Sequence, residues 1–376
     1  MLGPWDPIQH DPSQALAALE RRLAAEYKNP THYAIEISRQ THSVTIKFLE
    51  SGKEVFGVDV VPAYSHGTNS FGDDMYVVPE IALRSRLERQ QIRAAVARGE
   101  REMAWIASDP RGYITAASKL NSANEDFRRA VKFCKGWRHS CKTADPEFPL
   151  KSFHLEQAIT HWMSRNPGAE IYDAVFEFFC RLPDYIRYPQ FPDRADKSRN
   201  IDEYVSGLSE SERRKVVEAR DGFLIKLENF KEGDDVASLL AVSRRKRASD
   251  TEEYLFDKRI PVLTEADFSI VGNVQERAGG FRGYVLDKLG LIQVDRKIQF
   301  RLGRDAPVAD LYKWKVKNDD ASPEPRGEIT DNSTKNDPEH TKFKGEHCVE
   351  CFAISNGVCI GRSLQNVVLQ NVWSAG

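Results

Sequence analysis

Phe56-Gly57-Val58-Asp59-Val60-Val61-Pro62-Ala63 is the stretch of sequence that decides the fold. It is an apolar run of strand length with a single carboxylate in it, Asp59. Aspartate is depleted in strands and is seldom buried without a partner. The side chain therefore needs a buried hydrogen bond or ion pair, or a metal ion such as Mg²⁺, which prefers oxygen ligands. The metal is the favoured interpretation, and we expect Asp59 on a central strand, facing a cleft between sheet and helices.

The segments around this stretch predict an α+β protein. An amphipathic helix and three strands are expected at residues 12–28, 33–38, 43–49 and 55–61. The Gly- and Asp-rich segment 64–74 predicts a loop. Apolar residues at helical spacing then predict helices at 124–138, 153–164, 169–182, 201–208, 210–230 and 235–242. The last third changes to strands, at 297–302, 310–317, 346–354 and 367–370. A helical half is thus followed by a small, mostly β domain.

Composition limits the classes of function. The 376 residues carry 54 Lys and Arg against 56 Asp and Glu, and this balance argues against a protein dedicated to duplex nucleic acid. The sequence contains no run of about 18 apolar residues, so it predicts no membrane-spanning helix. The first residues, MLGPWDPIQHDPSQ, do not resemble a secretory signal. We read the six cysteines as reduced thiols and expect a cytoplasmic protein.

Val58-Asp59-Val60-Val61-Pro62-Ala63-Tyr64 resembles the third-carboxylate strand of the nucleotidyltransferases related to cyclic GMP-AMP synthase and oligoadenylate synthase. It is most similar to the bacterial CD-NTases of the SMODS type, which make cyclic oligonucleotide signals in CBASS antiphage defence. Further pieces resemble the family's motifs in the same order, over about residues 1–240. These pieces are Ser43–Ile46, Tyr76–Glu80, Ser108–Pro110 with Asn121, Val131–Trp137 and Lys151–Glu156.

The resemblance implies roles for four residues. Asp59 would be the catalytic carboxylate that holds a divalent metal, Mg²⁺ or Mn²⁺. Lys135 would contact the donor triphosphate, Ser152 would lie beside that triphosphate, and Phe153 would lie near the base. From the residues alone, Lys135 could equally be a surface lysine and Ser152 a helix cap, while His154 reads as a packed helix residue.

The far end of the chain resembles a second family. Leu311–Asn318, Arg326–Glu328 and Gly345–Cys351 are similar to the sensor domain known as AGS-C, which is found after adenylyl and guanylyl cyclases and SMODS nucleotidyltransferases. The expected domains are therefore a nucleotidyltransferase domain with its helical half at 1–240, a linker region at 241–290 and an AGS-C-like domain at 291–376. The resemblance implies a nucleotide ligand or an effector at this last domain.

Two parts of the family's active site do not precede Asp59 in this sequence. Relatives begin the site with a Gly-Ser turn that holds the donor phosphates, and then have a D-x-D strand with two more metal ligands. Residues 1–11 instead resemble the segment that relatives have after the D-x-D strand, so we expect an N-terminus truncated relative to the family. One carboxylate cannot hold two metal ions, and the chain as given is expected to be inactive.

Three other features of the sequence have a structural interpretation as well as a functional one. Cys348 and Cys351 suggest zinc, but residues three apart on a strand face opposite sides, and we expect no zinc site. Trp314 could stack on a base or fill the core of a small β-sandwich. The basic run at 244–247 reads as a solvated linker rather than a contact to nucleic acid.

Three hypotheses of function remain open. The first is a nucleotidyltransferase that joins nucleoside triphosphates into a cyclic or linear oligonucleotide. The second is a non-enzymatic protein that senses nucleotides or partners on a degenerate nucleotidyltransferase scaffold. The third, an enzyme acting on RNA ends, is disfavoured by the near-neutral charge.

Overall fold

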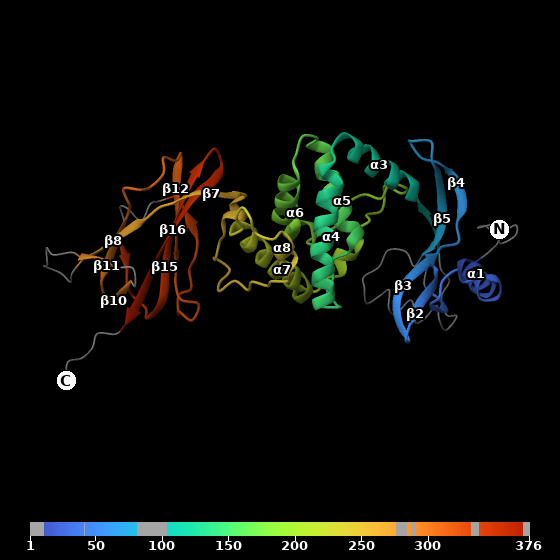
Figure 1. The fold of residues 1–376 in the computed structure, drawn as a ribbon, viewed down its shortest axis with the longest axis horizontal. Coiled ribbons are helices and arrows are strands. Elements are labelled where there is room, and N and C mark those ends of the chain that lie inside the picture. The colour runs from blue at the N-terminus through green and yellow to red at the C-terminus, as the bar shows by residue number, and fades with distance from the viewer. Residues whose placement is uncertain are drawn as a thin grey trace. The chain divides into compact units, whose positions relative to one another are not determined.

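The computed structural model describes residues 11–40, 42–80, 104–275, 284–286, 290–331 and 338–370. The chain divides into two compact units, Met1–Val217 and Glu218–Gly376, and each is described by itself (Figure 1). Helices and strands are mixed as predicted, and the fold class is α+β. No helix among the described residues is long and apolar enough to cross a membrane.

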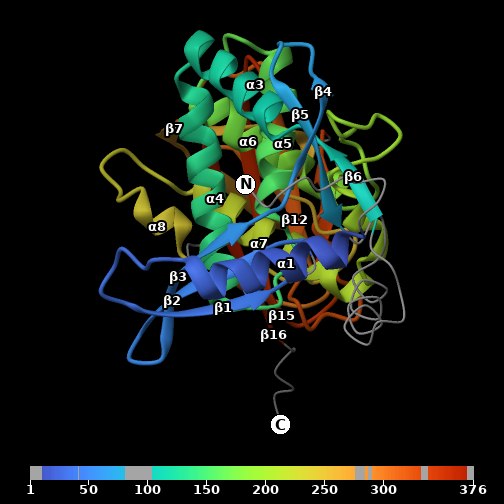
Figure 2. The same cartoon turned by 90° about the vertical axis from the view of Figure 1, so that its right-hand side faces the viewer.

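The first unit begins with a helix on a three-stranded antiparallel sheet. Helix α1 (Pro12–Glu26) is capped by Asp11, whose carboxylate accepts a hydrogen bond from the Ser13 N–H at 2.7 Å. Figure 2 shows α1 along the sheet of β1 (Ala34–Arg39), β2 (Val44–Glu50) and β3 (Lys53–Val60). Leu16 and Leu19 pack on Val44. The helix and the three strands of this region match the prediction because each has its own clear hydrophobic period.

A second antiparallel sheet comes next, in the order β4-β5-β6. Its strands are β4 (Tyr64–Thr68), β5 (Asp74–Glu80) and β6 (Ala104–Ser108). The loop predicted at 64–74 is therefore wrong in its first half, where β4 pairs with β5. Gly67 and Gly72 have φ of 85° and 84°, so these glycines allow the backbone to turn within a hairpin instead of marking a long loop.

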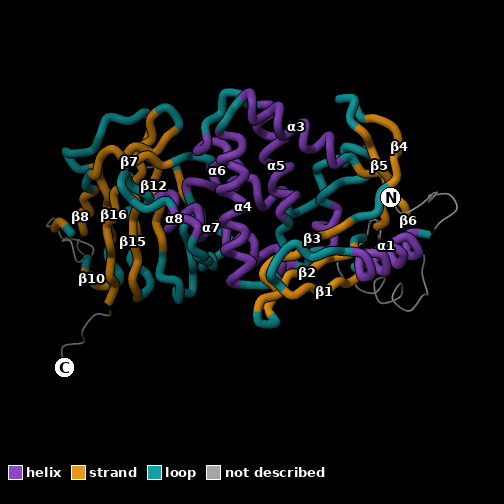
Figure 3. The backbone as a smooth tube through the Cα atoms, turned by 45° about the vertical axis from the view of Figure 1, so that its right-hand side comes forward, coloured by secondary structure: helices purple, strands orange, loops and turns teal. Residues whose placement is uncertain are grey.

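Among the described residues, four helices form the rest of the first unit's core, and Figure 3 shows them in purple. They are α3 (Pro110–Ala123), α4 (Asp126–Ala144), α5 (Ser152–Arg165) and α6 (Ile171–Tyr185). Trp137 of α4 is buried with its ring edge-on to Phe148 and Phe179. The short helix η1 (Glu203–Gly207) and the start of α7 (Glu210–Glu228) follow in the same unit. This packing holds α6 and the segment before α5 against α4.

The second unit is a β-sandwich preceded by two short helices, α8 (Ala237–Leu240) and η2 (Leu255–Lys258). One sheet has the order β10-β16-β15-β12-β13, with β7 also on β16, and the other has the order β14-β11-β8-β9. Buried side chains of both sheets, including Phe300, Trp314 and Val349, form one core. The strands are β7 (Val262–Asp267), β8 (Ile270–Gln275), β9 (Tyr284–Val285), β10 (Leu291–Gln293), β11 (Lys297–Leu302), β12 (Leu311–Lys317), β13 (Ile329–Thr330), β14 (Glu339–His340), β15 (Gly345–Ser355) and β16 (Val358–Gln370).

The linker predicted at 241–290 is wrong. Strands β7 and β8 lie within it, where β7 pairs with β16 and β8 pairs with β11. Phe268, Ile270 and Val274 belong to the buried core. The sandwich therefore begins well before the predicted residue 291.

The basic run 244–247 is not a solvated linker either. Arg247 donates to Asp221 at 2.8 Å and to Asp257 at 2.9 Å, while Arg245 donates to Glu252 at 3.2 Å. Asp221 and Glu252 are buried, and they come from segments outside the run. The charges of Arg245 and Arg247 are therefore neutralised within the second unit, whereas Lys246 between them is exposed.

Candidate functional site

A cavity of about 720 Å³ lies among α3, α4 and α5 of the first unit. We call it the α4 cavity. The side chains that matter for its chemistry are Asp109, Tyr113, Arg128, Lys132, Lys135, Phe153, Glu156 and Asp193. Two of the four predicted site residues, Lys135 and Phe153, line it. Ser152 is the first residue of α5, directly before Phe153.

Three cations on α4 form one row along this cavity. Arg128, Lys132 and Lys135 are spaced four and then three residues apart, a spacing that places side chains on one helical face. Within the described residues, Arg128 and Lys132 are exposed and have no ion-pair partner. Lys135 pairs with Glu156 of α5. The row thus presents two uncompensated charges and one that is partly neutralised.

The N-terminus of α5 opens at the same cavity without a side-chain cap. Lys151 occupies the cap position, but its side chain makes no cap hydrogen bond; its ammonium group lies over the Tyr204 ring instead, 4.5 Å from the ring centre. Within the described part of the chain, the N–H groups of Ser152 and Phe153 have no protein acceptor. Free N–H groups and the positive end of the helix dipole favour an anion here.

An aromatic wall stands beside these polar groups. The ring of Phe153 lies edge-on to Tyr113, with 4.9 Å between the ring centres, and 40% of Phe153 is exposed. Tyr113 is fixed by the Arg194 backbone N–H, which donates to its hydroxyl at 2.9 Å. Burial raises the pKa of Tyr113 above its usual range, so the hydroxyl stays neutral. An exposed aromatic ring beside an anion site is suited to a planar ring with a charged group.

Asp109 has a structural role at the α4 cavity, because its carboxylate is used in hydrogen bonds within the protein. Its buried carboxylate caps α3 by accepting from the Gly112 N–H at 2.8 Å. It also accepts from the Asn69 side chain at 2.8 Å and from Arg194 at 3.4 Å. A Cβ at Gly112 would lie 2.1 Å from this carboxylate, so only glycine fits there. These contacts fix the start of α3 beside the hairpin of β4 and β5.

Asp59 is not where the sequence predicts it. It lies on β3, which among the described residues pairs with β2 alone and is therefore an edge strand rather than a central one. Its side chain is exposed, and one carboxylate oxygen accepts from the Thr45 hydroxyl at 2.5 Å. The apolar Val55, Phe56 and Val58 of the same strand are also exposed. Lys135 lines the α4 cavity and Asp59 does not, so the predicted common cleft of these two residues is not this cavity.

The metal expected at Asp59 finds no complete set of ligands here. The Thr45 hydrogen bond uses one of the acceptor sites of the carboxylate, so Asp59 could still bind a metal as a single protein ligand. The described residues contain no group of three or more His, Cys, Asp or Glu side chains that could hold a metal ion. These residues therefore do not fit the divalent ion, and we derive no catalytic step through it.

The other candidates of the sequence have structural roles. His154 is buried and hydrogen-bonded to the Tyr204 hydroxyl at 2.9 Å; burial lowers its pKa to about 3, so the ring is neutral. Trp314 is buried in the sandwich core, as the structural interpretation predicts. Cys351 is buried in the same core, whereas Cys348 is only half-buried.

Sequence reasoning missed Tyr113, Arg128, Lys132 and Glu156 as members of the site. The spacing of Arg128, Lys132 and Lys135 was the available signal, because it places three cations on one face of a predicted helix. Tyr113 and Glu156 carry no such signal, since only the packing of α3 and α5 against α4 brings them to the cavity.

Comparisons with known proteins relate the chain to a solved structure and to one protein family. No curated protein matches the chain. Among solved structures, the chain is similar to one titled "Structure of E. coli MS115-1 CdnC:HORMA-deltaN complex", with 15% identity, a TM-score of 0.38, and coverage of 61% of this chain and 67% of that chain. Residues 249–370 match the model of the family described as "Adenylyl/Guanylyl and SMODS C-terminal sensor domain". The matched residues contain the β-sandwich of the second unit and the motifs between Leu311 and Cys351 that resemble this family.

Proposed function

We propose that the first unit is a nucleotidyltransferase domain of the cyclic-oligonucleotide-synthase type, as used in CBASS antiphage signalling, and that its α4 cavity holds the triphosphate of a nucleoside triphosphate. The order of the sequence motifs supports the family, and so does the sensor domain in the second unit. The observation that carries the binding site is the row Arg128, Lys132 and Lys135, which faces the uncapped N-terminus of α5 across one cavity.

The chemistry of the cavity fits a nucleotide in two parts. Lysine and arginine side chains and free backbone N–H groups are the usual ligands of phosphate oxygens. Lys132 and Lys135 would contact the triphosphate, with Ser152 beside it. Phe153 and Tyr113 would contact the base, since an aromatic face stacks on any base with little dependence on its identity.

Binding and synthesis are separate questions for residues 1–376. Asp59 offers a single carboxylate, and the described residues contain no group of three or more His, Cys, Asp or Glu side chains that could hold a metal ion. We therefore propose that this chain binds nucleoside triphosphates without joining them. The same geometry supports the second hypothesis, a nucleotide-responsive protein on a nucleotidyltransferase scaffold.

Equilibrium titration of residues 1–376 with ATP and GTP tests the binding site. The double variant Lys132→Gln with Lys135→Gln should bind at least about tenfold more weakly, because two charge-assisted hydrogen bonds are lost. Arg129→Gln is the matched control, since Arg129 lies on the same helix but pairs with Asp126, away from the cavity. Equal losses in both variants would refute the assignment.

An activity assay distinguishes the two hypotheses. Residues 1–376 are incubated with all four triphosphates and Mg²⁺ or Mn²⁺, and the products are separated chromatographically. We expect bound nucleotide but no oligonucleotide. A cyclic or linear product that disappears with Asp59→Asn would establish the enzyme and would contradict the proposed inactivity.

A further inference from the structure

A second pocket lies in the sensor domain, at one end of the β-sandwich. Its volume is about 390 Å³, at the low end of the roughly 300–1,000 Å³ typical of small-molecule sites. The interior is apolar and comes from both sheets, with Ile298 and Phe300 from β11, Val316 from β12 and Leu369 from β16. We call it the sandwich pocket. Its size suits one ligand no larger than a mononucleotide.

Aromatic and imidazole rings surround the apolar interior at the rim of the sandwich pocket. Phe343, His340 and His347 line it, in addition to Phe300 inside. His347 is held in place, because one ring nitrogen accepts from the Asp319 N–H at 3.3 Å and the other lies 2.9 Å from the Phe343 carbonyl oxygen. Rings beside an apolar space, one of them held by hydrogen bonds, favour a planar ligand over a flexible chain.

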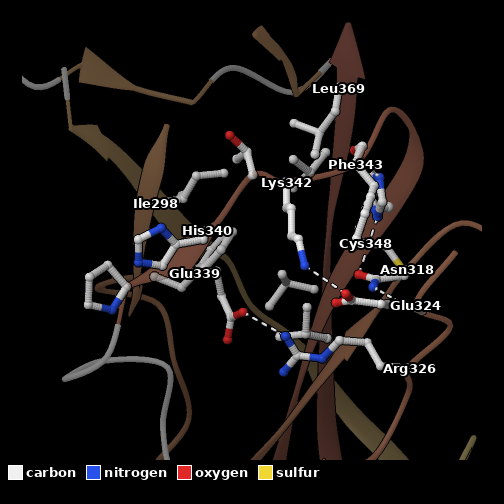
Figure 4. Close-up of a pocket in the computed structure, with 17 residues that line it drawn as sticks. Ile298, Asn318, Glu324, Arg326, Glu339, His340, Lys342, Phe343, Cys348 and Leu369 are labelled. Atoms are coloured by element: carbon white, nitrogen blue, oxygen red, sulfur yellow. Dashed lines mark hydrogen bonds and ion pairs between the residues drawn. The ribbon is translucent and has the colours of Figure 1, made fainter. Parts of the chain in front are cut away.

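Two cations stand at the same rim, as Figure 4 shows. Arg326 pairs with Glu339 at 3.0 Å and Lys342 pairs with Glu324 at 2.6 Å. The side chains of Lys342 and Glu324 are each 63% exposed, and exposed ion pairs of this kind contribute little to stability. An incoming anion can therefore replace Glu324 at little cost. Arg326 uses only one of its nitrogens for Glu339, and its remaining donors are free among the described residues.

From these observations we infer that the sandwich pocket binds a nucleoside monophosphate, with the base in the apolar interior and the phosphate between Arg326 and Lys342. The two carboxylates balance the two cations, so an anion without a ring, which makes no contact with the apolar interior, gains little by binding at this rim. This inference is independent of the α4 cavity, which belongs to the other unit of the chain.

Cys348 provides a readout confined to this pocket. It lines the pocket and is half-buried, whereas the other five cysteines are buried. Burial raises the pKa of the Cys348 thiol to about 11, so the thiol is alkylated slowly, and a bound ligand can slow this alkylation further.

The experiment treats residues 1–376 with N-ethylmaleimide and follows alkylation of the peptide that contains Cys348 by mass spectrometry. The additions compared are AMP, GMP, CMP, UMP, the four nucleosides and inorganic phosphate. A nucleotide bound only in the α4 cavity leaves this rate unchanged.

We expect at least one monophosphate to slow Cys348 alkylation by about tenfold at saturation, with its nucleoside acting at higher concentration and phosphate having no effect. Arg326→Gln with Lys342→Gln should raise the required monophosphate concentration by about tenfold and leave the nucleoside unaffected. Lys344→Gln, an exposed neighbour outside the pocket, should change neither. Equal protection by phosphate alone, no protection by any monophosphate, or an unchanged concentration in the double variant would each overturn the inference.

Discussion

The Lys135 ammonium group pairs with the Glu156 carboxylate at the wall of the α4 cavity, and this pair joins α4 to α5. Both side chains are partly exposed, with 38% and 24% of their surface accessible. Glu156 therefore has two effects on Lys135, the residue that we propose contacts the triphosphate. It holds the Lys135 side chain in place, and it competes with the triphosphate for the Lys135 charge. Neutralising the Glu156 carboxylate shows which effect is larger.

Glu156→Gln should tighten the binding of ATP by several-fold. The amide keeps the shape of the side chain but no longer neutralises Lys135, so the ligand gains a full charge. Titration of the variant and the parent protein at one ionic strength measures the change. Glu125→Gln, which removes the same charge from the start of α4 outside the cavity, serves as the control. Weaker binding in Glu156→Gln would show that the pair positions Lys135 more than it shields it.

Gly112→Ala should destabilise the first unit by about 2 kcal/mol. The new methyl group would lie 2.1 Å from Asp109 and would displace the carboxylate that caps α3. Gly168→Ala is the matched control, because nothing lies within 4 Å of its Cβ, and its effect should stay within about 0.5 kcal/mol. Urea denaturation of both variants checks the difference. Equal stability would mean that Asp109 does not hold the start of α3.

Arg247→Met should destabilise the second unit by about 2–3 kcal/mol. The change leaves the buried Asp221 with Arg220 as its remaining partner and removes a hydrogen bond at 2.7 Å to the Glu252 carbonyl. Lys246→Met, at the exposed neighbouring position, should change the free energy of unfolding by less than about 0.5 kcal/mol. If the two variants behave alike in urea denaturation, the run 244–247 is solvated after all.

Glu228 should make the second unit less stable as the pH rises. Burial raises the pKa of its carboxyl from 4.5 to about 7, although Arg362 and Lys315 act in the opposite direction and Glu350 adds to the rise. The folded state therefore holds this proton more tightly than the unfolded state does. The stability gained from the proton is complete below pH 4.5, falls through the interval up to about 7, and is lost above it.

The variant Glu228→Gln isolates this effect. At about pH 8.5 it should exceed the parent protein in stability by an amount on the order of 3 kcal/mol, and at about pH 4.5 the two should be similar. Thermal or urea denaturation at the two pH values provides the comparison. The same difference at both pH values would assign the change to packing rather than to the proton.

The elements that the sequence predicts best are those with a long, unmixed hydrophobic period. The strand predicted at 297–302 coincides with β11, and the three N-terminal strands lie within about two residues of their observed bounds. Short strands such as β10 and β13 were missed because two or three residues carry no period, and their pairing with β16 and β12 fixes them. Tertiary contacts decide what local pattern leaves open.

In the candidate site, too, some residues could be predicted from local motifs, and others depend on tertiary contacts. Lys135 and Phe153 could be predicted because each belongs to a motif with a local form. The burial of Asp109 depends on Asn69 and Arg194, which are 40 and 85 residues away in sequence. The misplacement of Asp59 has a related cause, since an apolar strand with one carboxylate has the same pattern at the edge of a sheet as at its centre. No local period distinguishes these two positions.

The most direct test of the nucleotide-binding proposal is a crystal structure of residues 1–376 with an ATP analogue that cannot transfer its nucleotidyl group. We expect the triphosphate beside Lys132 and Lys135 at the N-terminus of α5, and the adenine against Phe153 or Tyr113. Binding in the α4 cavity with the phosphates turned away from these lysines, or no nucleotide in the cavity at saturating analogue, would contradict the account.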